Sequence, residues 1–211
     1  MKTVTSFTLN LAAAVLIVLA SATIAAAAGT DTCVGAGAII GGTCTPLTNT
    51  TSGDNDNTAL GFQAFDSNTT GRANTATGAD ALVWNTTGSG NTATGSGALF
   101  GEATGGTGLG TGGGNTATGF DALDHNTTGD NNTAAGADAL QGNTTGIENT
   151  ATGEFALNNN TTGGSNIGIG SFAGDNLTTG DNNIDIGNEG VAAESNTIRI
   201  GTKGKQTRTV I

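Results

Sequence analysis

Hydrophobic and polar positions recur with a period of 17 residues over most of the chain. A typical unit is NTATGADALVWNTTGSG at residues 74–90, with Asn first, Gly fifth, Ala eighth and an apolar residue ninth. The units begin at Asn57, Asn74, Asn91, Asn115, Asn132, Asn149, Asn166 and Asn183. One step is 24 residues long instead of 17, because residues 105–114 contain a Gly-rich insertion. Such regular columns predict a repeat protein whose successive units stack on one another.

Each unit predicts two short extended pieces joined by two turns. In the first piece, NTATG, alternate residues point to opposite faces, and Gly permits the turn that follows. The second piece centres on Ala-Leu and is followed by NTTG, whose Asn and Gly are typical turn residues. We therefore predict an all-β fold, a parallel β-solenoid of 17-residue coils over residues 53–202. Its internal column would contain Leu82, Leu99, Leu123, Leu140 and Leu157.

The composition indicates that the hydrophobic core of the predicted solenoid is thin. Charged residues make up only 11% of the chain and Gly accounts for 37 of its 211 residues. Low charge and many Gly residues also occur in disordered chains, but those lack strict columns. A coil that buries little more than one Leu and a few Ala side chains gains little from the hydrophobic effect. We therefore expect further burial between chains, in an oligomer.

The N-terminal segment predicts export. Residues 1–28 combine Lys2, the apolar run LAAAVLIVLA and small residues up to Ala28, as a signal peptide does. A membrane anchor is the alternative, but the apolar run is shorter than the ~20 residues that span a bilayer. Residues 29–52 would form an N-terminal cap in which Cys33 and Cys44 pair in a disulfide, since export permits oxidation. No membrane span is expected in the mature chain.

Charge excludes one class of partner. The chain has a formal net charge of −11, and removing Lys2 with the signal peptide makes it more acidic. Phosphate backbones require basic residues on one face, so nucleic-acid binding is not expected. Arg199, Lys203, Lys205 and Arg208 lie near the C-terminus, where residues 203–211 would form a basic polar tail.

The columns also support a family resemblance. NTATGADALVWNTTGSGNTATG is similar to the N-T-A-x-G-x-x-A-L-x-x-N-T-T-G repeats of bacterial surface and tail-fibre-like proteins, which are related to the heads of trimeric autotransporter adhesins. The ending GNEGVAAESNTIRIGT at residues 187–202 resembles the segment that closes such arrays. The resemblance implies a left-handed β-roll, three chains side by side, and a rod or head that touches surfaces.

Catalytic and metal-binding groups are sparse in the sequence. His125 is the single histidine and has no second His, Ser or Cys partner nearby, so we interpret it as a solvated turn residue. Trp84 is expected to be an exposed or interface aromatic. Acidic turns at residues 53–57, 129–132 and 180–183 leave a weak Ca²⁺ site open, although solvated turns suffice to explain them. We predict no enzyme activity and no cofactor.

Pairs of Thr residues form the most specific candidate site. The pairs would stack into two ranks on one face: Thr75, Thr77, Thr92, Thr94, Thr116, Thr118, Thr150 and Thr152. Regular Thr ranks are typical of ice-binding solenoids. However, Leu60 and Ala135 interrupt one rank, and Ile replaces Thr in the last units, which favours a face packed inside the coil or between chains. We expect an exported surface or extracellular rod that forms homotrimers, with ice binding as the alternative.

Overall fold

The computed structural model of the chain describes residues 32–33, 56–101, 110, 112–202 and 204–205. Short β-strands follow one another along this part of the chain, and none of it is helical. The strands are β1 (Thr32–Cys33), β2 (Thr58–Leu60), β3 (Thr75–Thr77), β4 (Thr92–Thr94), β5 (Thr116–Thr118), β6 (Thr133–Ala135), β7 (Thr150–Thr152), β8 (Ile167–Ile169), β9 (Ile184–Ile186) and β10 (Ile198–Ile200).

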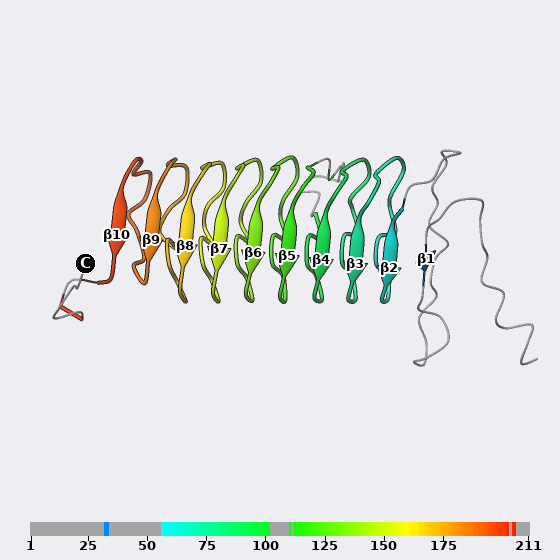
Figure 1. Cartoon of the computed structure of the whole chain (residues 1–211), viewed down its shortest axis with the longest axis horizontal. Coiled ribbons are helices and arrows are strands. Elements are labelled where there is room, and N and C mark those ends of the chain that lie inside the picture. Colours follow the sequence, from blue (N-terminus) through cyan, green and yellow to red (C-terminus); the bar gives the residue numbers. More distant parts are fainter. Residues whose placement is uncertain (1–31, 34–55, 102–109, 111, 203, 206–211) are drawn as a thin grey trace, which may run out of the picture.

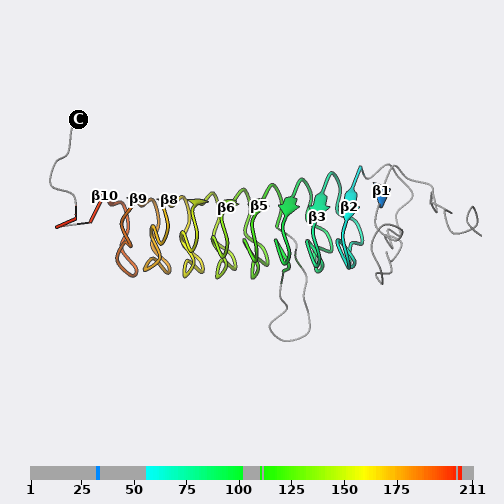
Figure 2. The same ribbon diagram turned by 90° about the horizontal axis from the view of Figure 1, so that it is seen from below.

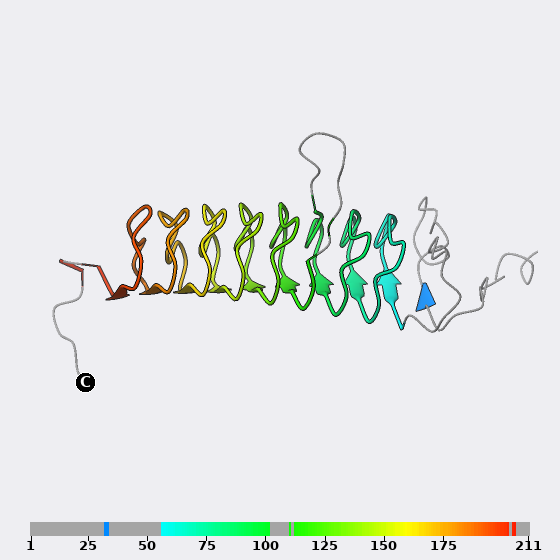
Figure 3. The ribbon, with the colours of Figure 1, turned by 90° about the horizontal axis from the view of Figure 1, so that it is seen from above.

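All of these strands belong to one parallel sheet whose spatial order is the sequence order, β1 to β10. Figure 1 shows them side by side along a rod, with coils of chain behind the strands from β2 to β9. In Figure 2 the strands line one long side of the rod and the turn segments form the opposite side, and Figure 3 shows the same from the other direction. The prediction of an all-β parallel solenoid of 17-residue coils is confirmed.

The register is set by identical positions in neighbouring units. Thr75 pairs with Thr92, and Thr92 pairs with Thr116 even though that step spans 24 residues. The insertion therefore leaves the sheet unbroken. At the C-terminal end the repeat shortens to 14 residues, yet Ile184 still pairs with Ile198. Parallel pairing keeps like residues adjacent because each coil returns the chain to the same place, one strand spacing (about 4.8 Å) further along.

The alternation of the strands decides which residues enter the core. The middle residue of each strand from β2 to β7 is Ala, and each of these Ala side chains is buried. The residues on either side point outward, as the burial patterns of β3, β4 and β7 show. Ala is small enough to let the strand approach the opposite wall of the coil closely. This narrowness explains why one large side chain per coil fills the interior.

The predicted second strand around Ala-Leu is wrong, because this segment consists of turns. Leu82, Leu123 and Leu140 have φ values of 55°, 56° and 52°, in the left-handed region that non-Gly residues enter at a cost of about 1–2 kcal/mol. Hydrogen bonds between coils offset this cost, since Leu123 N–H donates to the Ala139 carbonyl at 3.0 Å. The segment therefore stacks coil on coil without being extended.

The ninth-position column is internal, as predicted. Leu82, Leu99, Leu123, Leu140 and Leu157 are all buried, together with Phe65 at the equivalent place. The Ala that precedes each Leu is buried beside it. Left-handed φ at the Leu turns its side chain toward the strand and away from solvent. The main apolar core is therefore one column of Leu side chains between two columns of Ala side chains.

Glycine at the fifth position is required by close contact between coils. Gly136 has a φ of +148°, and a Cβ there would lie 2.4 Å from the carbonyl oxygen of Gly153 in the next coil. A real side chain cannot occupy that space. The column of Gly after each strand therefore reflects coil-to-coil contact as well as turn geometry.

Candidate functional site: the outer face of the sheet

The outer face of the sheet carries the Thr pairs that the sequence singled out. Register places Thr75, Thr92 and Thr116 in one rank and Thr77, Thr94 and Thr118 in the other. The side chains are partly or fully exposed while the Ala between them is buried. The sequence left two locations open for this face, inside the coil or between chains. Its exposure in the single chain excludes the inside of the coil.

The two ranks are not uniform along the rod. Thr150 and Thr152 on β7 are separated from the six preceding Thr residues by β6, where Ala135 interrupts the second rank. Leu60 interrupts the same rank at β2 and is exposed. Three neighbouring strands, β3 to β5, thus provide the longest complete Thr array.

The C-terminal part of the same face is apolar. The outward positions of β8, β9 and β10 are all Ile: Ile167, Ile169, Ile184, Ile186, Ile198 and Ile200. Ile169 is 43% exposed, and Ile198 and Ile200 are each 68% exposed. We call these six residues the Ile patch. A contiguous group of large apolar side chains on the surface is typical of an interaction site.

Asn residues at the first position form a ladder inside the coils, which the sequence analysis had not predicted. All eight, from Asn57 to Asn183, are buried. The Oδ1 of Asn132 accepts the backbone N–H of Asn149 at 2.9 Å and its Nδ2 at 3.1 Å. The Nδ2 of Asn132 donates to the carbonyl of Gly146 at 2.8 Å. The strict Asn column is visible in the sequence, but Asn is also a common turn residue, so the column alone does not show that these side chains are buried.

A second Asn ladder occupies the NTTG segments. Asn143 Nδ2 donates to Asn126 Oδ1 at 2.9 Å, and Asn160 Nδ2 donates to Asn143 Oδ1 at 3.2 Å. The ladder ends where Leu177 replaces Asn in the next coil, so Asn160 Oδ1 is buried without a partner. Because these Asn side chains point inward, the folded coils do not present them as glycosylation acceptors.

The acidic turns link neighbouring coils. Asp130 Oδ1 accepts the backbone N–H of Gly113 at 2.7 Å, and Asp181 Oδ1 accepts that of Gly164 at the same distance.

Another acidic residue, Asp121, lies near Asp138. Burial raises the pKa of Asp121, and the nearby charge of Asp138 raises it further. Among the described residues, no group of three His, Cys, Asp or Glu side chains is placed to hold a metal ion.

Trp84 and His125, the two further candidate residues of the sequence analysis, lie at the surface of the turns. Trp84 is partly exposed, and its carbonyl accepts the N–H of Gly110 beside the insertion. His125 Nδ1 lies 3.1 Å from the Gln141 carbonyl, and its Nε2 lies 3.6 Å from an Asp124 oxygen. Both environments are those of a structural turn.

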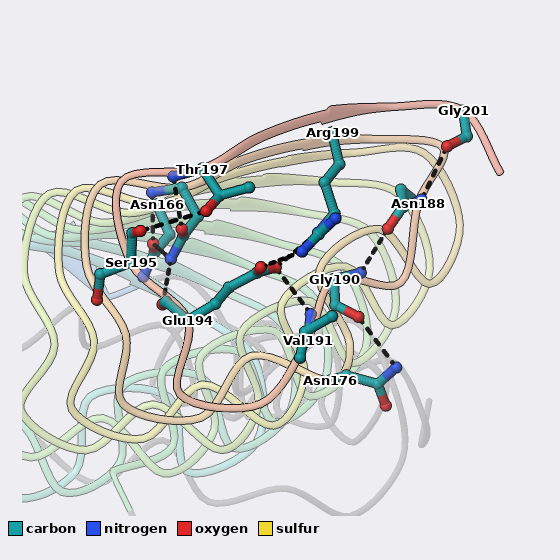
Figure 4. Close-up of polar contacts among 11 residues, drawn as sticks. Asn166, Asn176, Asn188, Gly190, Val191, Glu194, Ser195, Thr197, Arg199 and Gly201 are labelled. Carbon is teal, nitrogen blue, oxygen red and sulfur yellow. Dashed lines mark hydrogen bonds and ion pairs between the residues drawn. The ribbon is translucent and has the colours of Figure 1, made fainter. Parts of the chain in front are cut away.

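Charged side chains gather at the C-terminal coil. Asp185 is the middle residue of β9 and occupies the interior column that Ala fills in the earlier coils. Arg199 is its partner in β10 and binds Glu194, as Figure 4 shows. The pKa of Asp185 is raised to about 6: burial is the largest cause, the Glu194 charge acts in the same direction, and Arg199 opposes both. The hydrogen bond from Arg199 in turn lowers the pKa of Glu194.

Several predictions concern residues outside the described part. The signal peptide, most of the cap and most of the basic tail lie there, as does Cys44, so the Cys33–Cys44 disulfide stays a prediction. Within the described residues we find no helix of the length and apolarity needed to cross a bilayer.

The fold and the face together define a class: a parallel β-solenoid of 17-residue coils with an outer sheet surface of Thr ranks that end in Ile. No protein-family model, curated protein or solved structure matches the chain. Functional inference therefore depends on the geometry of this surface.

Proposed function

We propose that the chain is an exported, non-catalytic rod, adhesin-like or structural, that acts at the cell surface or outside the cell. The observation that carries the proposal is the outer sheet face, which is long, regular and partly apolar. The signal-like N-terminus and the resemblance to adhesin-head repeats support the location and the role.

Self-association through this face, as a homotrimer, belongs to the same proposal. Each Ile side chain of the Ile patch would gain roughly 1–3 kcal/mol on full burial. Thr hydroxyls along the rest of the face could bond to one another across chains, so that their burial leaves no polar group unsatisfied. Three sheets packed around a common axis would cover both kinds of side chain, which is what the resemblance to trimeric adhesins leads us to expect.

The test is sedimentation of the mature chain with two matched variants. Ile169→Lys places a charge on the proposed interface, whereas Ile147→Lys changes a residue of similar exposure (46%) outside the sheet face. We expect wild type and Ile147→Lys to sediment as trimers and Ile169→Lys as a monomer with unchanged circular dichroism. A monomeric wild type would refute the assembly. Co-sedimentation with candidate glycan, protein or mineral surfaces tests adhesion in the same experiment.

Ice binding is the second candidate, and the observation that favours it is the in-register Thr array on β3 to β5. Parallel pairing spaces each rank by about 4.8 Å, which gives a flat and regular polar surface. Under this alternative the chain is monomeric and shows thermal hysteresis. Thr94→Tyr would then abolish the hysteresis without lowering the melting temperature.

A further inference from the structure

Asp185 is the one carboxyl placed in the strand-centre column of the described coils. The same position is Ala in β2 to β7 and Gly168 in β8. Asp185 is only 1% exposed, and neither of its carboxylate oxygens has a hydrogen-bond partner. A Cβ on Gly190 would lie 2.9 Å from Asp185 Oδ2 and 3.2 Å from Leu177, so the carboxyl is enclosed. Such a group is costly when ionised.

The cation beside Asp185 is already bound to another carboxylate. Arg199 pairs with Asp185 in the register of β9 and β10, but its Nε donates to Glu194 Oε1 at 2.8 Å and its Nη2 donates to Glu194 Oε2. Glu194 Oε1 also accepts the backbone N–H of Val191 at 2.9 Å. Figure 4 shows this arrangement, in which Glu194 holds Arg199 and the turn together. Glu194 and Arg199 are the charged groups that act on Asp185.

Two carboxylates therefore share one guanidinium, and the buried one is without a hydrogen bond. A proton taken from solvent by Asp185 removes its charge and the repulsion with Glu194, and leaves the Arg199–Glu194 pair intact. Loss of that proton leaves an anion without a hydrogen bond inside the last coil, and Arg199 offsets its charge only in part. Opening the coil exposes this anion to water, which stabilises it.

We propose that Asp185 is a proton-binding switch that closes the C-terminal coil of the solenoid: in its neutral form β10 stays stacked on β9, and in its ionised form the coil opens. The proposal does not depend on the function proposed above. It has a consequence for that function, since β9 and β10 carry four of the six residues of the Ile patch.

The direction of the effect follows from the pKa. In the folded chain the pKa of Asp185 is raised from 3.8 to about 6, so closure is favoured at low pH and weakens as the pH rises. Between about pH 5 and about pH 7.5 the opening equilibrium should increase roughly tenfold. Glu194 stays ionised throughout this range because its pKa is lowered from 4.5.

The experiment is hydrogen exchange on the mature chain, corrected for the intrinsic pH dependence of exchange. The reporting amides are Ile184, which donates to Thr197, and Gly201, which donates to Ile186. We expect about tenfold more opening at about pH 7.5 than at about pH 5 for these amides. The Thr133 amide in the middle of the rod should show no change. The same comparison in a His125→Gln background removes the single histidine of the chain as a source of pH dependence.

Two variants at Asp185 and one control decide the outcome. Asp185→Asn keeps the shape and Asp185→Ala restores the residue of the earlier coils, and both should abolish the pH dependence. Asp130→Asn, an exposed carboxyl in another coil, should leave it unchanged. If wild-type protection of Ile184 and Gly201 is the same at both pH values, or if Asp185→Ala retains the dependence, the proposal is wrong. A carbon-13 titration of the wild-type Asp185 carboxyl near pH 4 would also overturn it.

Discussion

Replacing one buried rung of the first Asn ladder, Asn132→Ala, should destabilise the whole rod. Asn132 Oδ1 is the acceptor for the Asn149 backbone N–H at 2.9 Å, and alanine leaves that buried donor without a partner. The Asn149 side chain, the Asn115 side chain and the Gly146 carbonyl each lose one of their hydrogen bonds. The sequence neighbours of Asn132 cannot replace these bonds because they point outward.

The magnitude follows from the number of groups affected. An unsatisfied buried N–H costs about 1–3 kcal/mol, and each of the other lost bonds contributes about 0.5–1.5 kcal/mol before relaxation. We expect a loss of roughly 2–5 kcal/mol in the free energy of unfolding. For a chain of this size that corresponds to a decrease of about 5–20 °C in melting temperature.

The assay is thermal unfolding followed by far-ultraviolet circular dichroism, with hydrogen exchange at the Asn149 amide as a local readout. Asn176→Ala is the matched control, because Asn176 is exposed and its side chain donates only a 3.4 Å bond to the Gly190 carbonyl within the described residues. The control should change the stability by no more than about 0.5 kcal/mol. Equal and small shifts for Asn132→Ala and Asn176→Ala would refute the conclusion that the ladder stabilises the coils.

Three further predictions concern the core, the Gly column and the outer face. Leu123→Ala should cost about 2–5 kcal/mol in chemical denaturation, because Leu123 is fully buried and the neighbouring coils cannot collapse onto the gap; an unchanged midpoint would contradict the internal column. Gly136→Ala should lower the melting temperature far more than Gly187→Ala, since a Cβ at Gly136 meets the Gly153 carbonyl and its φ is +148°, whereas Gly187 has a φ of +59° and a Cβ there meets nothing within 4 Å. Equal losses would contradict the close contact between coils at Gly136. In a trimer Thr94→Ile should be tolerated or slightly stabilising when measured by thermal unfolding, because Ile169 already occupies the equivalent place; dissociation to monomers would count against the interface.

The columns of the sequence were sufficient to predict the solenoid, its coil length and its internal Leu column. Stacking is the reason, since each residue of one coil lies against the same position of the next, and its environment therefore repeats along the chain. The Thr pairs were likewise placed on one face by strand alternation alone. The shortened last step, from Ile184 to Ile198, was visible as the 14-residue spacing of the closing segment.

The inward or outward direction of each column could not be read from the same pattern. Asn is a common turn residue, so Asn132 gave no sign that its amide spans two coils inside the rod. The Ala-Leu segment was expected to be extended, but Leu123 has a left-handed φ of 56° and both Ala122 and Leu123 are buried.

What the sequence by itself determined is the repeat: period, register and the residues that share a column. Only the tertiary structure decided which columns point into the core and which point outward. It placed Thr94 on the outer face and buried the Asn ladder and Asp185 inside the coils. The physical reason is that closure of a coil joins residues from opposite ends of each unit. Asn132 and Gly146, for example, are 14 residues apart and meet through one hydrogen bond. Periodicity describes equivalence between coils, whereas burial depends on contacts within each coil.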